Sequence, residues 1–249
     1  FYQKLEKKST GENLYPKLKL IAEKILNDEI LSTRTTEKEF FTDKQLHEKV
    51  RYEIFKRFGY FVTESSEHFA EYVPWFIKKN RQDLIDKYKI PINEYIDRCE
   101  LYIKMWKELD NDIAPIIDQP IKRSNEYASY IIDAIKNNKE VTINGNIMND
   151  KLIENLPTDC CVEVPCKIDS TGLNPIFVGK LPIHLAALMR TNINVQLLTA
   201  EAVITKKKDT IFHAAMLDPL TASLLSIDEI YKMTEELLIA HKKYLPEYY

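Results

Sequence analysis

Apolar residues recur mostly at intervals of three and four along the chain, the spacing that predicts amphipathic helices. Residues 12–30 and 43–58 show it first, and the apolar positions of the second segment are Leu46, Val50, Ile54 and Phe55. Gly59 follows and is placed to end that helix, because glycine readily adopts the left-handed conformation of helix C-termini. The opening residues FYQKLE read as the end of a strand.

Further helices are predicted on both sides of the middle of the chain. Residues 92–111 and 123–138 have helical periodicity, and residues 67–76 fit a short helix that stops near Pro74. From Leu181 onward the chain reads as helical again. The segments are 181–205, which predicts one long and largely buried helix, then 209–220 and 226–245.

Between residues 139 and 179 the pattern changes to β-branched runs separated by turn residues. The stretches KEVTINGNI, CCVEVPCKID and NPIFVG each predict a strand. No internal repeat and no low-complexity linker interrupts the sequence. The expected fold is therefore α+β, mainly helical with a small mixed or antiparallel sheet.

Composition narrows the class of protein. A chain of 249 residues with 45% hydrophobic content can bury a core as one large domain or two small ones. Its net charge of −3 gives no extended positive surface, so nucleic acid is not an expected partner. No apolar run approaches the roughly 20 residues of a membrane span, and no GxGxxG phosphate loop is present. The first residue is not Met, and we expect the chain to begin within a longer protein.

The four cysteines are Cys99, Cys160, Cys161 and Cys166. Adjacent residues of a strand point to opposite faces, so Cys160 and Cys161 cannot easily join one metal site. CxxC and HxxxH are absent. Free thiols in a reducing compartment are the simpler interpretation, and we expect a cytoplasmic protein.

The stretch TESSEHFAEY, residues 63–72, is the first candidate for chemistry. In a helix, Glu67 and Glu71 share one face, and His68 and Tyr72 share the neighbouring face. His68 can act as a general base near neutral pH, whereas Tyr72 needs a strongly lowered pKa to do so. The alternative is an ordinary capped helix start, with Thr63 as the cap.

Asparagines are dense in residues 141–166, at Asn144, Asn146, Asn149 and Asn155. Their side chains both donate and accept hydrogen bonds, as recognition of sugar hydroxyls requires. Asparagine is equally favoured in turns, which is the structural alternative.

Four polar residues interrupt the predicted apolar helix 181–205 within the stretch RTNINVQ. They are Arg190, Asn192, Asn194 and Gln196. These side chains are costly to bury unless paired, so they line a polar cleft or cap neighbouring elements. His184 and His213 stand among apolar residues and fit core histidines better than ligands. In RSNEYAS, the residues Arg123, Ser124 and Glu126 fit either a salt bridge at a helix start or a substrate clamp.

Seven stretches, taken in series, resemble the family 4 glycoside hydrolases, and the α-galactosidase branch with its α-glucosidase and α-galacturonidase relatives is the most similar. They are FGYFVTESSEHFAEYVPWF, RSNEYAS, NGN, NLPTDCCVEVPC, LPIHLAAL, RTNINVQ and HAAMLDPLTA. The resemblance implies a fold similar to the C-terminal domain of lactate dehydrogenase. It also implies a small carbohydrate substrate and a homodimer or homotetramer.

The chemistry that the resemblance implies departs from the usual pair of glycosidase carboxylates. Enzymes of this family use NAD⁺ to oxidise the sugar C3 hydroxyl, and a base then removes the acidified C2 proton. A divalent metal, usually Mn²⁺, stabilises the resulting anion. The glycosidic oxygen is eliminated, water adds, and the ketone is reduced again, so that NAD emerges unchanged.

The sequence departs from the family pattern at its start. The family begins with a dinucleotide-binding domain, followed by Cys-His-Ser-like and Asn-His motifs that hold the metal, and none of these is present. We therefore expect residues 1–249 to be the C-terminal, substrate-side part of such an enzyme, without the main NAD and metal sites. The resemblance places a base near TESSEHFAEY, where His68 ranks slightly ahead of Tyr72.

Residues of the sugar pocket are also implied. They are Arg190, Asn192 and Asn194, followed by Asn144 and Asn146. Two other functions fit less well. One is a catalytically silent domain that supplies fold and oligomer contacts, and the other is an oxidoreductase domain similar to lactate or malate dehydrogenase.

Overall fold

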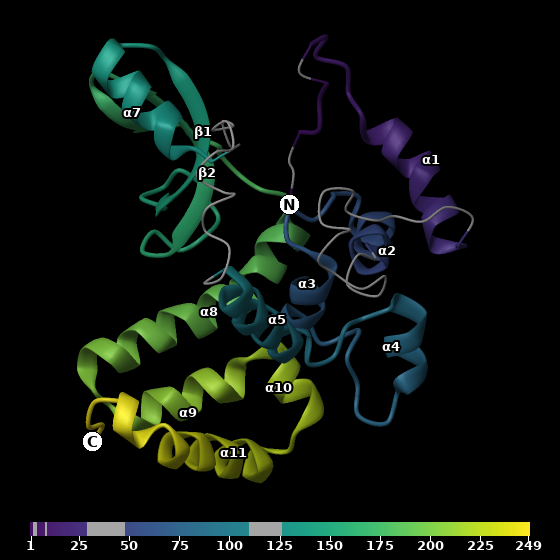
Figure 1. The fold of residues 1–249 in the computed structure, drawn as a ribbon, viewed down its shortest axis with the longest axis vertical. Coiled ribbons are helices and arrows are strands. Elements are labelled where there is room, and N and C mark those ends of the chain that lie inside the picture. Colours follow the sequence, from purple (N-terminus) through teal and green to yellow (C-terminus); the bar gives the residue numbers. More distant parts are fainter. Residues whose placement is uncertain (2–3, 8, 29–47, 110–125) are drawn as a thin grey trace. The chain divides into compact units, whose positions relative to one another are not determined.

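A computed structural model describes residues 1, 4–7, 9–28, 48–109 and 126–249 (Figure 1). These residues form two compact units. Unit 1 comprises Phe1–Ile92 and Ala187–Tyr249, and unit 2 comprises Asn93–Ala186. Helices dominate, and the described strands form one three-stranded sheet, which confirms the predicted mainly helical α+β class.

The first half of unit 1 consists of α1 (Tyr15–Leu26), α2 (Lys49–Phe58), α3 (Ser66–Tyr72) and α4 (Gln82–Tyr88). Val50 and Ile54 of α2 pack with Phe69 of α3 in one buried cluster. Ile25 of α1 and Phe55 of α2 belong to a second cluster. Helix α2 thus packs through two different sets of apolar residues, one toward α3 and the other toward α1.

Gly59 ends α2 as predicted. Its φ is 76°, and its N–H donates to the carbonyl of Phe55 at 2.9 Å. Only glycine adopts this left-handed conformation without cost. A Cβ at Gly59 would meet no atom within 4 Å. Glycine is therefore favoured here by its backbone conformation and not by lack of space for a side chain.

Several boundaries in this half differ from the prediction. Ser65, not Thr63, caps α3, because the Oγ of Ser65 accepts the backbone N–H of His68 at 3.4 Å. The helix ends at Tyr72, before Pro74. The short helix α4 was not predicted, and the expected N-terminal strand is only an isolated bridge between Glu6 and Asn13. Leu46 lies outside the described residues.

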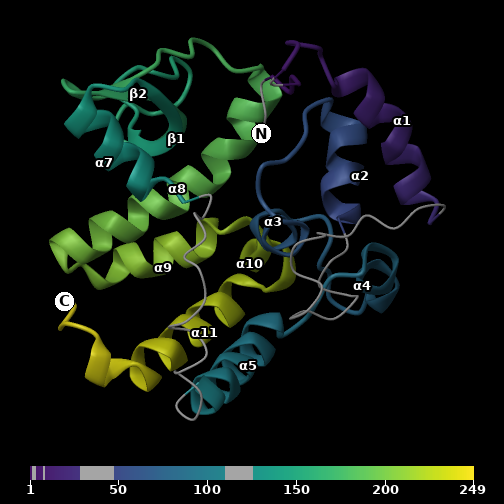
Figure 2. The ribbon, with the colours of Figure 1, turned by 45° about the horizontal axis from the view of Figure 1, so that its top comes forward.

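The second half of unit 1 contains α8 (Ile183–Thr205), α9 (Lys208–Leu217), α10 (Pro219–Leu224), α11 (Ile227–Ala240) and the 3-10 turn Lys242–Tyr244. The first four residues of α8 belong to unit 2. Helix α9 packs against α10 and α11, as Figure 2 shows. Phe212 of α9 stacks on Tyr231 of α11 with ring centres 4.6 Å apart.

The burial predicted for α8 was wrong. Ile183 is 85% exposed and Ile204 is 78% exposed, and of its residues only Leu185, Ala186, Ile193 and Ala202 are buried by the described chain. The helix is apolar around most of its circumference, a composition typical of full burial. In the structure the other apolar residues of α8 are partly or fully exposed, and Leu188 is a partly buried one that packs against the cluster of Val50, Ile54 and Phe69.

Unit 2 carries α5 (Glu94–Leu109), α7 (Ala128–Asn137), β1 (Val141–Met148), β2 (Cys161–Asp169) and β3 (Gly172–Pro175). The strands pair in the order β1-β2-β3, and both pairings are antiparallel. Helix α7 contacts β1 and β2, and alternate residues of β2, among them Val164 and Cys166, are buried. The opposite face of the sheet, which includes Asn144 and Glu163, is exposed within the described chain.

Two boundaries in unit 2 were predicted incorrectly. The third strand ends at Pro175, so most of NPIFVG is not strand. Instead, Val178 donates to the carbonyl of Leu152 at 2.9 Å in a loop. Helix α7 starts at Ala128, while Arg123 and Ser124 lie outside the described residues.

None of the helices in the described part of the chain is long and apolar enough to cross a membrane.

Candidate functional site

Helix α3 presents the two residues expected to carry base chemistry. Its buried face is formed by Phe69 and Ala70, which leaves His68 and Tyr72 on the outer side. The His68 side chain is 40% exposed, and Tyr72 is 45% exposed. Both are therefore accessible to a ligand on the surface of unit 1.

A polar network anchors the start of α3 to α2. The Oγ of Ser66 donates to Oε2 of Glu48 at 3.1 Å, and Nη1 of Arg51 lies 3.3 Å from Oε1 of the same carboxylate. The guanidinium of Arg51 also donates to the Val62 carbonyl at 2.6 and 3.0 Å, and lies 4.4 Å from the Phe61 ring centre. Neither Glu48 nor Arg51 was predicted, because both look like ordinary residues of an amphipathic helix in the sequence.

His68 has a carboxylate partner one helical turn away. Its Nδ1 lies 3.4 Å from Oε2 of Glu71. When Nδ1 carries the proton and donates it to Glu71, the lone pair of Nε2 is available to accept a proton. This arrangement suits a general base, because the hydrogen bond to Glu71 orients the ring. Glu67, which was expected to share a face with Glu71, is buried instead.

Tyr72 is less suited to act as a base. Partial burial raises the pKa of its hydroxyl, and the nearby carboxylates of Glu64 and Glu71 raise it further. A tyrosine base needs the opposite shift, because its phenolate must be present near neutral pH. The Tyr72 hydroxyl therefore remains protonated there and can donate a hydrogen bond.

Helix α8 brings one predicted substrate residue to the end of α3. The amide nitrogen of Asn192 donates to the carbonyl of Tyr72 at 3.2 Å, across 120 residues of sequence. Arg190 and Asn194 are exposed and lie about 160° around the helix from Asn192, given about 100° per residue. The structure thus brings Asn192 to Tyr72 and places Arg190 and Asn194 on another side of α8.

The asparagines of unit 2 separate into two classes. Asn144 and Asn146 are exposed on the sheet, opposite Pro165 and Glu163. Asn149 is fully buried and holds the loop that follows β1, and Asn155 exchanges two hydrogen bonds with the Leu181 backbone. Asn149 therefore has the turn function that was the alternative prediction, whereas Asn155 links its loop to a segment 26 residues away.

The remaining histidine and cysteine candidates do not form a metal cluster within the part of the chain that the structure describes. His184 and His213 are exposed, so the expectation of core histidines was wrong. Cys160 is buried and Cys161 exposed, as expected of adjacent residues at a strand. Among the described residues, no three His, Cys, Asp or Glu side chains lie close enough to hold a metal ion. The sequence also contains no glycine-rich phosphate loop.

The family model for the family 4 glycosyl hydrolase C-terminal domain matches residues 1–221. The chain belongs to the family 4 glycoside hydrolases. It is 44% identical over 98% of its length to an α-galactosidase of Bacillus subtilis (strain 168), of which it covers 53%. It is 33% identical over 81% of its length to an α-galactosidase of Rhizobium meliloti (strain 1021), of which it covers 43%. This family 4 domain thus spans about half the length of the curated relatives it matches.

A solved relative confirms the fold of the family 4 domain. A 6-phospho-α-glucosidase from gut microorganisms, crystallised in complex with NAD and Mn²⁺, superposes with a TM-score of 0.71. The superposition covers 99% of this chain and 53% of the other, at 17% sequence identity. At that identity the likeness concerns the fold alone.

Proposed function

We propose that this chain forms the substrate-side part of an α-galactosidase. The observation that carries the proposal is the 44% identity to the Bacillus subtilis α-galactosidase, which extends over 98% of the chain. The Rhizobium meliloti relative is also named an α-galactosidase. The substrate class is accordingly a small α-galactoside, and the accessible polar residues at the end of α3 suit a sugar.

His68 is proposed as the base that accepts the proton from C2 of the sugar. Three features support this role: its exposure, the Glu71 carboxylate 3.4 Å from Nδ1, and the Ser65 cap that fixes its backbone. Tyr72 keeps its proton and donates a hydrogen bond to the substrate. Asn192 is held by the Tyr72 carbonyl, which leaves its side-chain oxygen to accept from a sugar hydroxyl.

The other predicted contacts remain proposals of lower rank. Arg190 and Asn194 lie on a different side of α8 from Asn192, so a single small sugar cannot contact all three from this helix alone. Asn144 and Asn146 form an exposed polar row in unit 2 that suits hydroxyl recognition.

NAD and a divalent metal are proposed as the cofactors of the whole enzyme. The solved 6-phospho-α-glucosidase of the same fold is in complex with both. Bound together they supply the redox step and stabilise the developing negative charge. Since the described residues offer no metal cluster, we propose that other residues of the enzyme hold both groups.

The test is cleavage of an aryl α-galactoside by the full-length protein supplied with NAD⁺, Mn²⁺ and a reductant. His68→Ala should lower kcat by about 10²- to 10⁴-fold, the range typical of a lost general base. His213→Ala is the matched control, because His213 is an exposed histidine of α9. Equal activity of the two variants would remove His68 from the mechanism, and a parent protein that cleaves no α-galactoside would contradict the proposed activity.

A further inference from the structure

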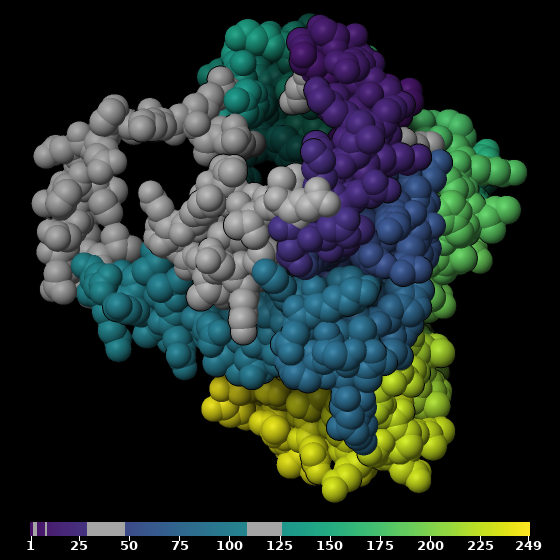
Figure 3. Space-filling view, turned by 90° about the vertical axis from the view of Figure 1, so that its right-hand side faces the viewer, coloured from purple at the N-terminus to yellow at the C-terminus, as the bar shows by residue number. Residues whose placement is uncertain are grey.

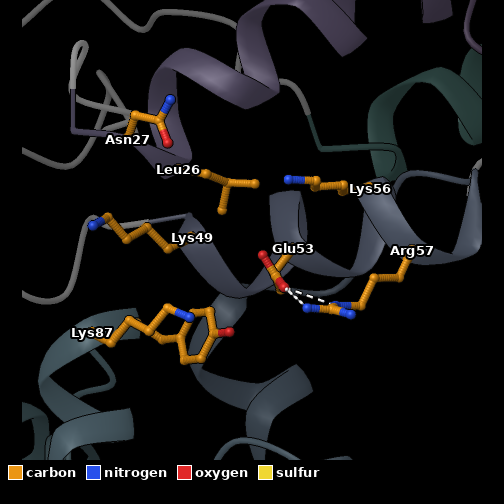
Figure 4. A pocket seen from close by; sticks show the side chains of 8 residues that line it. Leu26, Asn27, Lys49, Glu53, Lys56, Arg57 and Lys87 are labelled. Atoms are coloured by element: carbon orange, nitrogen blue, oxygen red, sulfur yellow. Dashed lines mark hydrogen bonds and ion pairs between the residues drawn. The ribbon is translucent and has the colours of Figure 1, made fainter.

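A pocket in unit 1 is formed by α2, α4 and the end of α1, and it shares no residue with the site at the end of α3. Figure 3 shows the face of the molecule over these three helices, and Figure 4 shows the pocket from close by. Its volume is about 270 Å³, just below the roughly 300–1,000 Å³ of pockets for drug-sized ligands. The pocket therefore suits a small molecule or a single charged group.

Cations dominate the walls of this pocket. They are Lys49, Lys56, Arg57 and Lys87, opposed by the single carboxylate of Glu53. Arg57 and Glu53 form an ion pair at 2.6 Å, and Lys49 is paired with Asp28 at 2.7 Å. The ammonium groups of Lys56 and Lys87 have no carboxylate partner among the described residues. The walls thus keep a net positive charge after the internal pairs are counted.

The cationic side chains line one pocket from different sides. In Figure 4 the guanidinium of Arg57 contacts the Glu53 carboxylate, and the Lys56 and Lys87 side chains lie on different sides of that ion pair. The ammonium group of Lys87 lies 4.9 Å from the centre of the Tyr88 ring. Nε and Nη2 of Arg57 face Glu53, which leaves the other guanidinium donors for a second acceptor. Like charges that line one small pocket repel one another, and an anion bound in the pocket reduces that repulsion.

An aromatic hollow adjoins the cationic pocket. It has a volume of about 330 Å³, shares Glu53, Arg57 and Tyr88 with its neighbour, and is otherwise lined mainly by rings and aliphatic groups. Trp75 is 43% exposed there and packs against Phe58 with ring centres 5.6 Å apart. Arg57 therefore stands at the border between a charged space and an apolar wall.

We propose that the cationic pocket binds a phosphate group, either as the free ion or as the phosphate ester of a small sugar whose ring lies against the Trp75 wall. Phosphate has the charge and the number of acceptor oxygens to engage two ammonium groups and the remaining donors of an arginine at once. A neutral sugar lacks the group that Lys56 and Lys87 would recognise.

The test is isothermal titration calorimetry of the full chain with inorganic phosphate, with glucose 6-phosphate and with glucose. Lys56→Ala/Lys87→Ala should bind both phosphate compounds at least about tenfold more weakly, as expected for loss of hydrogen bonds to a charged group. The matched control is Lys104→Ala/Lys232→Ala, which removes the same charge at lysines that are 74% and 78% exposed on other helices. It should bind phosphate like the parent protein.

The two ligand sources give different results. Tighter binding of glucose 6-phosphate than of inorganic phosphate would identify a sugar phosphate as the ligand, and equal binding would identify the free ion. The proposal is overturned if neither compound binds, or if both double variants weaken binding equally. Glucose carries no phosphate, so its binding reports on any sugar site that does not depend on phosphate recognition. Unchanged glucose binding by the Lys56→Ala/Lys87→Ala variant would therefore separate this pocket from the site at the end of α3.

Discussion

Replacing Asn149 by alanine should destabilise the protein by about 3 kcal/mol. Asn149 has no exposed surface and forms a hub of side-chain hydrogen bonds in the loop after β1. Its Oδ1 accepts the N–H of Ile153 at 2.7 Å, and its Nδ2 lies within 3.3 Å of the carbonyl oxygens of Ile153, Leu156 and Pro157. Alanine removes all of these partners without offering another.

The magnitude follows from what remains buried after the change. The Ile153 N–H loses its acceptor inside the protein, which costs about 1–3 kcal/mol. Nδ2 has only two protons for three carbonyls, so about two further hydrogen bonds are lost, at roughly 0.5–1.5 kcal/mol each. The Ile153 carbonyl still accepts from the Leu156 N–H, which limits the penalty at that group.

The assay is urea denaturation of Asn149→Ala beside Asn144→Ala. Asn144 is the matched control, because it is exposed on the neighbouring strand, and its loss should change stability by less than about 0.5 kcal/mol. If the two variants unfold at the same urea concentration, the hydrogen-bond hub does not hold the loop and the argument fails.

Three other changes have outcomes that the structure defines. Gly59→Ala should cost about 1 kcal/mol in thermal or chemical denaturation, because alanine must adopt a φ of 76° there; an unchanged stability would contradict this explanation. Ser226→Ala should cost about 1 kcal/mol, because Ser226 and Glu229 form a capping box at the start of α11, and Ser223→Ala is a suitable serine control. Tyr72→Phe should change the height but not the shape of the pH–rate profile between pH 6 and 9, because the raised pKa keeps the hydroxyl protonated throughout; the loss of an ionisation in that range would show that Tyr72 titrates.

Local signals in the sequence predicted much of this fold. Gly59 ended its helix, and the alternation in CCVEVPCKID predicted β2, because both depend on neighbouring residues alone. The N-cap of α3 was assigned to the wrong residue. The stretch TESS offers several side chains able to accept a backbone N–H, and the backbone conformation determines which of them is the cap. Helix α8 was expected to be buried, because an apolar composition does not reveal which residues find a partner.

The candidate site could be predicted only in part. The face shared by His68 and Tyr72 follows from helical periodicity. The contact of Asn192 with the end of α3 does not, because it joins residues 120 positions apart. Sequence also could not separate Asn149 from Asn144, since burial distinguishes a structural asparagine from an exposed one. The anchoring pair Glu48 and Arg51 has no sequence signal beyond its helix.

The most direct test of the account is cleavage of an aryl α-galactoside by the full-length protein in D₂O, with the galactose product analysed by NMR. Removal of the C2 proton by His68 predicts deuterium at C2 of the product. His68→Ala should slow cleavage and deuterium incorporation together, while His213→Ala keeps the rates of both. Cleavage that leaves the C2 proton in place would contradict the account, because hydrolysis would then proceed without the base that α3 is proposed to supply.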